Sequence, residues 1–105
     1  MTIALAIEYI PRRMNDIGIG TNYFIRYRHF VLQALETIEI DADNQFFIQV
    51  DEVEDITIQS EFGIYDLSET VLNEQQYEHQ GKITINNYST SIKHLRFIQV
   101  IPKII

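Results

Sequence analysis

The chain has 105 residues, of which 46% are hydrophobic, and it contains no cysteine. This composition predicts one globular domain over residues 1–105, and the lack of cysteine excludes disulfides and thiolate metal sites. A formal net charge of −7 argues against general binding to nucleic acid or to anionic membranes, because both require clustered cations.

Charge is distributed unevenly along the chain. Residues 36–78 contain thirteen Asp and Glu and no Lys or Arg. The residues before them hold four arginines against two acids, and residues 79–105 hold four cations and no acid. The three segments therefore carry +2, −13 and +4, which together give −7. Segments of opposite charge are expected to pair within the fold or to face a partner.

The first part of the chain predicts a strand, a loop and a second strand. Residues 1–7 are apolar but too few for a signal-peptide core or a membrane span, and they predict a buried strand. Residues 11–20 contain Pro and two Gly and predict a loop that carries Arg12 and Arg13. Residues 22–32 predict a long aromatic strand.

Arg26 and Arg28 share one face of the strand predicted over residues 22–32, because side chains alternate along a strand. With Tyr23 and Tyr27 nearby, these arginines could stack on a nucleic-acid base. Pairing with acids of a neighbouring strand or subunit is the simpler interpretation.

The rest of the chain alternates with a period of two. Polar residues alternate with isoleucine in three half-buried candidate strands, residues 36–41, 54–60 and 82–86. Residues 45–50 and 96–101 are apolar on both faces, which predicts strands that are covered on both sides or docked to a neighbour. Residues 62–67 are a further candidate strand, and Pro102 ends the last one.

Turns are expected at residues 41–44 and 86–90, where Asp, Asn, Ser and Thr accumulate. Residues 68–77 fit either a short helix with Ser68 as its N-cap or a polar loop. About eight short strands at this spacing predict an all-β fold: a jelly-roll-like antiparallel β-sandwich with at most one short helix.

A calcium site is one candidate among the acidic residues. The oxygen ligands of an EF-hand-like loop would fall on Asp41, Asp43, Gln45 and Glu52. Phe46 stands where that loop requires glycine, so a solvated turn is the alternative interpretation. We predict no metal site.

Neither a catalytic nor a cofactor site is predicted. His29, His79 and His94 lack the paired spacing of zinc ligands. The sequence contains no Gly-x-Ser-x-Gly nucleophile elbow, and the Gly18-Ile19-Gly20 segment lacks the third glycine and the helix of a phosphate loop.

The chain resembles small β-sandwich virion proteins of tailed bacteriophages, which decorate heads or serve as head-fibre and neck or tail accessory proteins. The resemblance rests on residues 31–40, 46–48, 81–89 and 97–102. Such chains often begin a strand with Leu-x-Ala-Gly-x-Thr, and Leu35 stands at the glycine position here. The resemblance implies a non-enzymatic structural subunit without cofactors, assembled in the host cytoplasm and located in the virion.

Such a subunit acts by assembly with itself, as a homo-oligomer, and with other virion proteins. We predict interface residues of two kinds: the polar anchors Arg12, Arg13, Arg26 and Arg28, and the apolar anchors Tyr23, Tyr27 and Phe47. The alternative is a carbohydrate- or ligand-binding β-sandwich module that uses loops at one end. A small hydrolase or cupin-like enzyme is a third interpretation.

Overall fold

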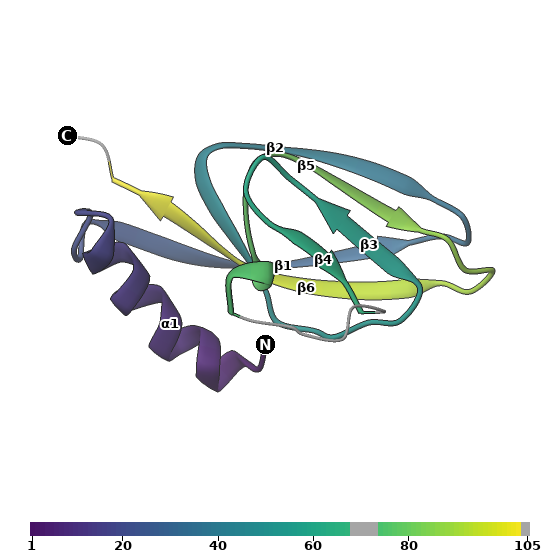
Figure 1. Ribbon diagram of the computed structural model, residues 1–105, viewed down its shortest axis with the longest axis horizontal. Coiled ribbons are helices and arrows are strands. Elements are labelled where there is room, and N and C mark those ends of the chain that lie inside the picture. Colours follow the sequence, from purple (N-terminus) through teal and green to yellow (C-terminus); the bar gives the residue numbers. More distant parts are fainter. Residues whose placement is uncertain (68–73, 104–105) are drawn as a thin grey trace.

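The computed structural model describes residues 1–67 and 74–103. In this part of the chain an N-terminal helix stands beside an antiparallel sheet (Figure 1). The elements are α1 (Ile3–Asp16), β1 (Tyr23–Leu32), β2 (Thr37–Gln49), β3 (Ile56–Gln59), β4 (Ile64–Asp66), the 3-10 helix η1 (Glu74–Tyr77), β5 (Glu78–Asn87) and β6 (Lys93–Pro102).

The six strands form one sheet in the order β1-β6-β2-β5-β3-β4, and every neighbouring pair is antiparallel. The predicted all-β fold is thus confirmed as an antiparallel sheet with one α-helix. A two-sheet jelly roll of about eight strands is not confirmed, because the described residues form six strands of one sheet. Most of the helix predicted over residues 68–77 lies outside the described residues, and its end forms η1.

Residues 41–44, predicted to be a turn, instead lie within a continuous β2, which has a bulge at residues 43–45. Ala42 pairs with Gly81, but Phe46 already pairs with Gln80, so the three residues between them have no partner on β5. Asn44 adopts a φ of 60°, a left-handed conformation that asparagine tolerates. Beyond the bulge β2 pairs with β6 as well as with β5. A bulge bends and twists its strand, so the sheet changes direction at this point.

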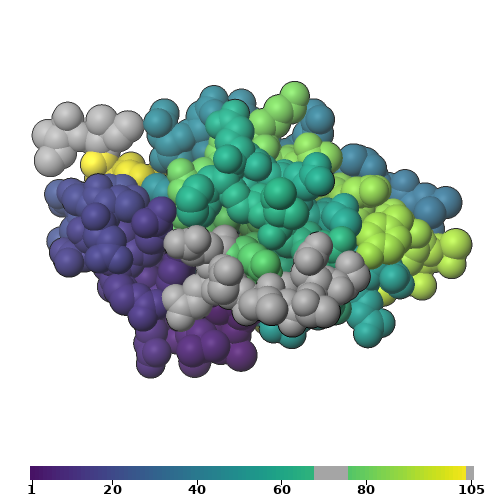
Figure 2. All heavy atoms as spheres, viewed as in Figure 1, coloured from purple at the N-terminus to yellow at the C-terminus, as the bar shows by residue number. Residues whose placement is uncertain are grey.

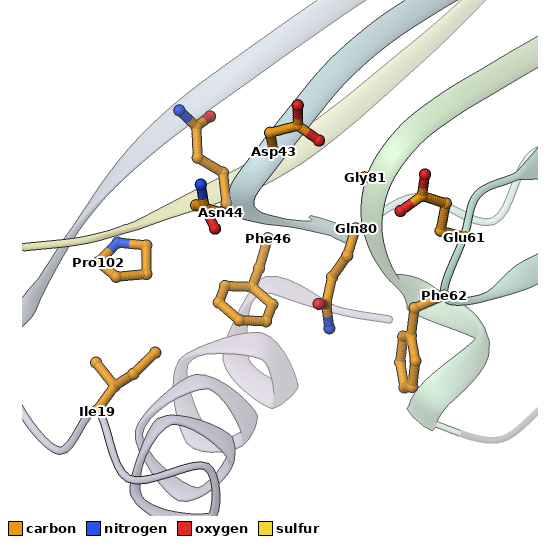
Figure 3. Close-up of a pocket in the computed structure, with 10 residues that line it drawn as sticks. Ile19, Asp43, Asn44, Phe46, Glu61, Phe62, Gln80, Gly81 and Pro102 are labelled. Atoms are coloured by element: carbon orange, nitrogen blue, oxygen red, sulfur yellow. The ribbon is translucent and has the colours of Figure 1, made fainter. Parts of the chain in front are cut away.

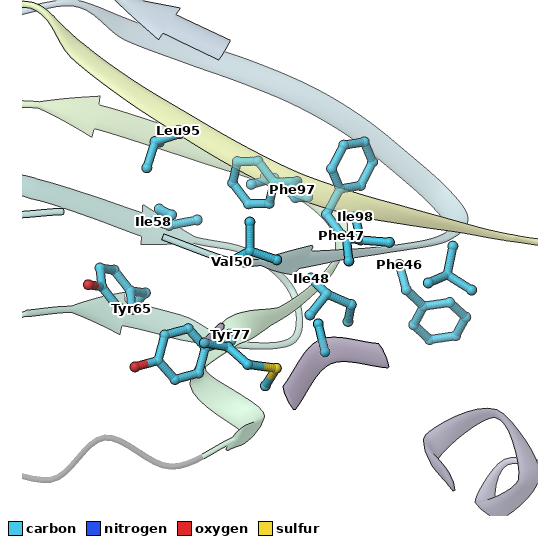
Figure 4. Close-up of a cluster of buried hydrophobic side chains, with 14 of the residues drawn as sticks. Phe46, Phe47, Ile48, Val50, Ile58, Tyr65, Tyr77, Leu95, Phe97 and Ile98 are labelled. Carbon is cyan, nitrogen blue, oxygen red and sulfur yellow. The ribbon is translucent and has the colours of Figure 1, made fainter. Parts of the chain in front are cut away.

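The hydrophobic core includes side chains of both faces of the sheet (Figure 4), since the consecutive residues Phe46, Phe47 and Ile48 are all buried. Ile58 of β3 lies opposite Ile85 of β5 and Tyr65 of β4, so these three fully buried side chains point the same way. Leu95 and Phe97 of β6 belong to the same cluster. Since two strands separate β6 from β3 in the sheet, the sheet must curl for both to reach one core.

The predicted N-terminal strand is wrong, because residues Ile3–Asp16 form helix α1. Thr2 caps the helix by accepting a hydrogen bond from the Leu5 N–H at 3.2 Å. Ala6, Ile10 and Met14 are buried and recur every four residues, which is the spacing of one helical face. Pro11 lies inside the helix at an exposed position, where it cannot donate a backbone hydrogen bond to the carbonyl of Ile7.

Helix α1 is fastened to the sheet by the carboxylate of Glu78, which is fully buried at the start of β5. Tyr9 donates its hydroxyl proton to Glu78 Oε1 at 2.8 Å, and Arg13 Nε approaches the same oxygen at 3.0 Å. Gln80 donates to the other carboxylate oxygen at 3.0 Å. A buried charge needs this degree of pairing to be tolerated.

We predict that Tyr9→Phe lowers the free energy of unfolding by about 2 kcal/mol, because the buried carboxylate loses a charge-assisted hydrogen bond while the ring volume is kept. Urea denaturation followed by circular dichroism measures the change. Glu8→Gln, at an exposed position of the same helix, is the matched control and should leave stability unchanged. Equal stability of Tyr9→Phe and the parent would show that the tether is unimportant.

The turn between β1 and β2 contains a strained residue. Leu35 has a φ of 61° and is 66% exposed, although left-handed backbone costs a branched side chain roughly 1–2 kcal/mol. This is the position at which the virion-protein pattern carries glycine.

We predict that Leu35→Gly raises the free energy of unfolding by about 1 kcal/mol, because the strain is relieved and little buried surface is lost. Leu35→Ala keeps the Cβ that causes the strain and should bring no such gain. The two variants are compared by urea denaturation. A destabilised Leu35→Gly variant would contradict the left-handed turn.

Candidate functional site

The seven predicted interface residues do not form one surface. Tyr23, Arg26, Tyr27 and Arg28 lie on β1, the strand at one edge of the sheet. The predicted loop around Arg12 and Arg13 is wrong, because both residues belong to α1. The candidate interface is therefore limited to β1. The predicted residues on helix α1 do not belong to it.

Three of the predicted interface residues make contacts with other residues of the same chain. Phe47 is 1% exposed and packs edge-to-face on Phe97, with ring centroids 5.8 Å apart, so it is a core residue. Arg13 pairs with Glu78, and this hydrogen-bonded ion pair raises the pKa of Arg13. The guanidinium of Arg28 lies over the Phe30 and Phe47 rings and donates to Gln99 Oε1 at 3.0 Å.

Strand β1 is a long open edge. One side pairs with β6 over ten residues, and no described strand pairs with the other side. Phe24, Ile25, Tyr27 and Val31 are all exposed large apolar side chains. Arg26 is exposed, and its side chain makes no hydrogen bond or ion pair with the described residues. Unpaired edges with apolar side chains pair readily with other chains unless charges prevent it.

The two edges of the folded sheet carry opposite charge, as a result of the charge segregation along the sequence. Strands β1 and β6 carry four cations and no acid, namely Arg26, Arg28, Lys93 and Arg96. Residues 54–67, which contain β3 and β4 at the other edge, carry four acids and no cation, namely Glu54, Asp55, Glu61 and Asp66. β3 and β4 lie on the face turned to the viewer in Figure 2. Opposite charges therefore gather at opposite edges.

Ion pairs join the two charge types at three places in the described part of the chain. Arg13 pairs with Glu78, Lys82 with Glu39 at 3.7 Å, and Arg96 with Asp51 at 2.7 Å. The Arg96 guanidinium holds the pKa of Asp51 below its ordinary value, chiefly through its hydrogen bonds. These pairs neutralise part of the acidic segment.

A pocket of about 690 Å³ opens beside the bulge of β2 (Figure 3). Phe46 and Phe62 provide aromatic surface, while Asp43 and Glu61 lie on different sides of it. Six further residues from four segments complete the lining: Ile19, Asn44, Gln45, Gln80, Gly81 and Pro102. Gly81 is favoured here because its φ of 73° is a left-handed conformation that residues with a Cβ adopt only at a cost.

The lining of this pocket combines acidic, amide and aromatic groups. It contains carboxylates, amides and aromatic rings, but among the described residues it contains neither a histidine nor a hydroxyl nucleophile. Without a cation, the pocket fits a neutral polyol or a positively charged group better than an anion.

Ser60 and His79 are joined by a hydrogen bond between their side chains. Ser60 Oγ is 3.1 Å from His79 Nδ1, and the same hydroxyl contacts the carbonyl oxygens of Phe62 and Gly63. A hydroxyl has one proton, which these carbonyls receive, so His79 Nδ1 must be the donor to Ser60. In this arrangement the bond holds His79 against the turn at Phe62 and Gly63.

Two residues of the predicted EF-hand-like register, Asp41 and Glu52, form hydrogen bonds within the fold. Asp41 accepts a hydrogen bond from the Asp43 N–H at 3.2 Å within the bulge of β2. Glu52 accepts a hydrogen bond from the Tyr77 hydroxyl at 2.9 Å. Burial, followed by this contact with Glu52, raises the pKa of Tyr77. In the described part of the chain, no three His, Asp or Glu residues are placed to hold a metal ion.

Comparison with known proteins gives no relative: no protein-family model, curated protein or solved structure matches this chain. The only α-helix among the described residues, α1, is too short to cross a membrane.

Sequence reasoning missed the pocket and the buried Glu78. Glu61, Phe62 and Gln80 belong to segments that meet only because β3, β4 and β5 pair. The single local signal is the Gly81 position within an otherwise regular alternation, because an isolated glycine in a strand often marks a close approach.

We predict that His79 makes stability fall in mild acid. Burial lowers the pKa of His79 from its ordinary 6.5 to about 4, so the unfolded chain binds a proton over a range in which the folded chain does not. The contribution is complete above pH 6.5 and is lost as the pH falls towards 4, by about 3 kcal/mol in total.

Urea denaturation between pH 7.5 and pH 4 measures this loss. His79→Asn keeps a donor towards Ser60 but cannot be protonated, so the parent should lose more stability than the variant over this range. Parallel pH profiles of the two proteins would contradict the prediction.

Proposed function

We propose that this chain is a non-enzymatic structural or accessory subunit of a bacteriophage virion, which acts by protein–protein assembly and is located in the virion after assembly in the host cytoplasm. The virion assignment is supported by the sequence resemblance over residues 31–102. The assembly role is supported chiefly by one observation, the apolar edge of β1, which no other described strand covers and which carries the exposed Arg26.

The charge pattern favours head-to-tail contact between copies. Pairing β1 with β1 of a second copy would bring the basic edges together, and like charges in one interface are unfavourable. Pairing β1 of one copy with the acidic β3–β4 side of the next brings Arg26 towards Glu61 or Asp66. Such a contact uses two different surfaces, so it leads to rings or filaments.

The fold is part of this proposal. The curled sheet encloses its core between strands that are distant in sheet order, as the two layers of a β-sandwich do. We therefore propose that the curled sheet is a variant of a β-sandwich. The virion proteins that residues 31–102 resemble have such a sandwich.

A second candidate function rests on the pocket beside the bulge. Aromatic surface next to carboxylates and amides is the combination that binds sugars, since the rings contact C–H faces and the polar groups bind hydroxyls. A carbohydrate-binding module would bind one sugar class saturably on a glycan array. Phe62→Ala should abolish that binding without affecting assembly.

We predict that Arg26→Glu and Glu61→Lys each weaken self-association about tenfold, because each replaces an attraction by a repulsion worth about 1.4 kcal/mol. Sedimentation velocity at low salt measures the association. Glu8→Lys, an exposed charge change on α1, is the matched control and should leave association unchanged.

Mixing the two variants distinguishes head-to-tail contact from pairing of β1 with β1. In head-to-tail assembly the double variant recovers association, because the two charges are exchanged. An equimolar mixture of Arg26→Glu and Glu61→Lys recovers association as well, because every contact between the two variants joins opposite charges. If β1 pairs with β1, Arg26→Glu alone has an effect. A parent protein that stays a monomer at high concentration, at any salt, and binds no virion component contradicts the proposal.

A further inference from the structure

Two exposed histidines lie together on adjacent strands, outside the pocket and the core. His29 of β1 pairs in register with Arg96 of β6, and Val31 pairs with His94. The histidines are therefore diagonal neighbours on one face of the sheet. His29 Nε2 lies 3.0 Å from His94 Nδ1, and the ring centroids are 5.2 Å apart.

Neither histidine has another role in the described part of the chain. Both are exposed, and each ring makes its one hydrogen bond to the other. A single hydrogen bond between exposed groups adds little to stability. The pair is thus two adjacent imidazole nitrogens, accessible to solvent, on a rigid ladder of ten residue pairs.

The separation of these nitrogens is that of two ligands on one metal ion. Imidazole nitrogens bind divalent transition metals at about 2.05 Å, and two of them 3.0 Å apart subtend about 94° at the metal. This angle is close to the roughly 90° between neighbouring ligands in tetragonal and octahedral complexes, which Cu²⁺ and Ni²⁺ prefer, and smaller than the tetrahedral angle of Zn²⁺.

We propose that His29 and His94 form a two-ligand site for a divalent transition-metal ion, with preference in the order Cu²⁺, Ni²⁺, Zn²⁺. The metal takes the place of the proton shared by the two rings, after each exposed ring turns towards it. Water fills the remaining positions, since no third His, Asp or Glu among the described residues is placed to bind.

The surroundings are compatible with a cation. The groups around the pair on this face are Tyr27, Val31 and Arg96. The positive charge of Arg96 is balanced by Asp51, which accepts hydrogen bonds from its guanidinium at 2.7 to 3.1 Å. Lys93 follows the opposite alternation on β6 and lies on the other face of the sheet.

The test is titration calorimetry with CuCl₂, NiCl₂ and ZnCl₂ at about pH 7.5, on protein without a polyhistidine tag. The expected result is one ion per chain. His29→Asn and His94→Asn should each weaken binding at least tenfold, and the double variant should be little weaker than either single variant, because each substitution destroys the same chelate.

Two further readouts distinguish chelation by this pair from unfolding and from binding elsewhere on the chain. Circular dichroism should show the same fold for all variants, since both positions are exposed. On addition of Zn²⁺, the NMR signals of the His29 and His94 rings should shift together, while those of the buried His79 stay in place. The proposal is overturned if no ion binds, if two ions bind independently, or if a single variant keeps its affinity within twofold.

Discussion

The bulge in the middle of β2 is the constraint on which the rest of this structure depends. Three residues without partners on β5 separate a first half of β2, which pairs with β5 alone, from a second half, which pairs with both β5 and β6. Bending at this point lets the sheet curl around one core. The three unpaired residues also line the pocket. The bulge in the pairing of β2 with β5 therefore shapes both the core and the pocket.

The folding of the sheet also determines where the basic and acidic segments lie. The two basic segments of the sequence flank the acidic one, and the chain brings β1 and β6 together at one edge although about sixty residues separate them. The acidic turns around β3 and β4 fall at the other edge. The chain neutralises part of this charge through Glu78, Glu39 and Asp51. An assembly that uses both edges is the simplest use of this arrangement.

The errors of sequence interpretation have identifiable physical causes. A run such as Ile3–Ile7 fits a strand or a helix equally well over a few residues, and only the longer recurrence of Ala6, Ile10 and Met14 indicates the helix. The turn predicted around Asp43 and Asn44 is sound as local chemistry, since these residues favour left-handed backbone. Whether such a segment reverses the chain or bulges within a strand depends on the strands beside it.

The sequence by itself determined the β character of the chain, most strand positions from Tyr23 onwards, and the separation of charge into three segments. These properties depend on local alternation and composition, which each segment carries alone. Only the tertiary structure decided the strand order, the burial of Phe47 and Glu78, the pocket at the bulge, and the meeting of His29 with His94. Each of these joins residues far apart in the chain, and no local pattern specifies which distant segments pair.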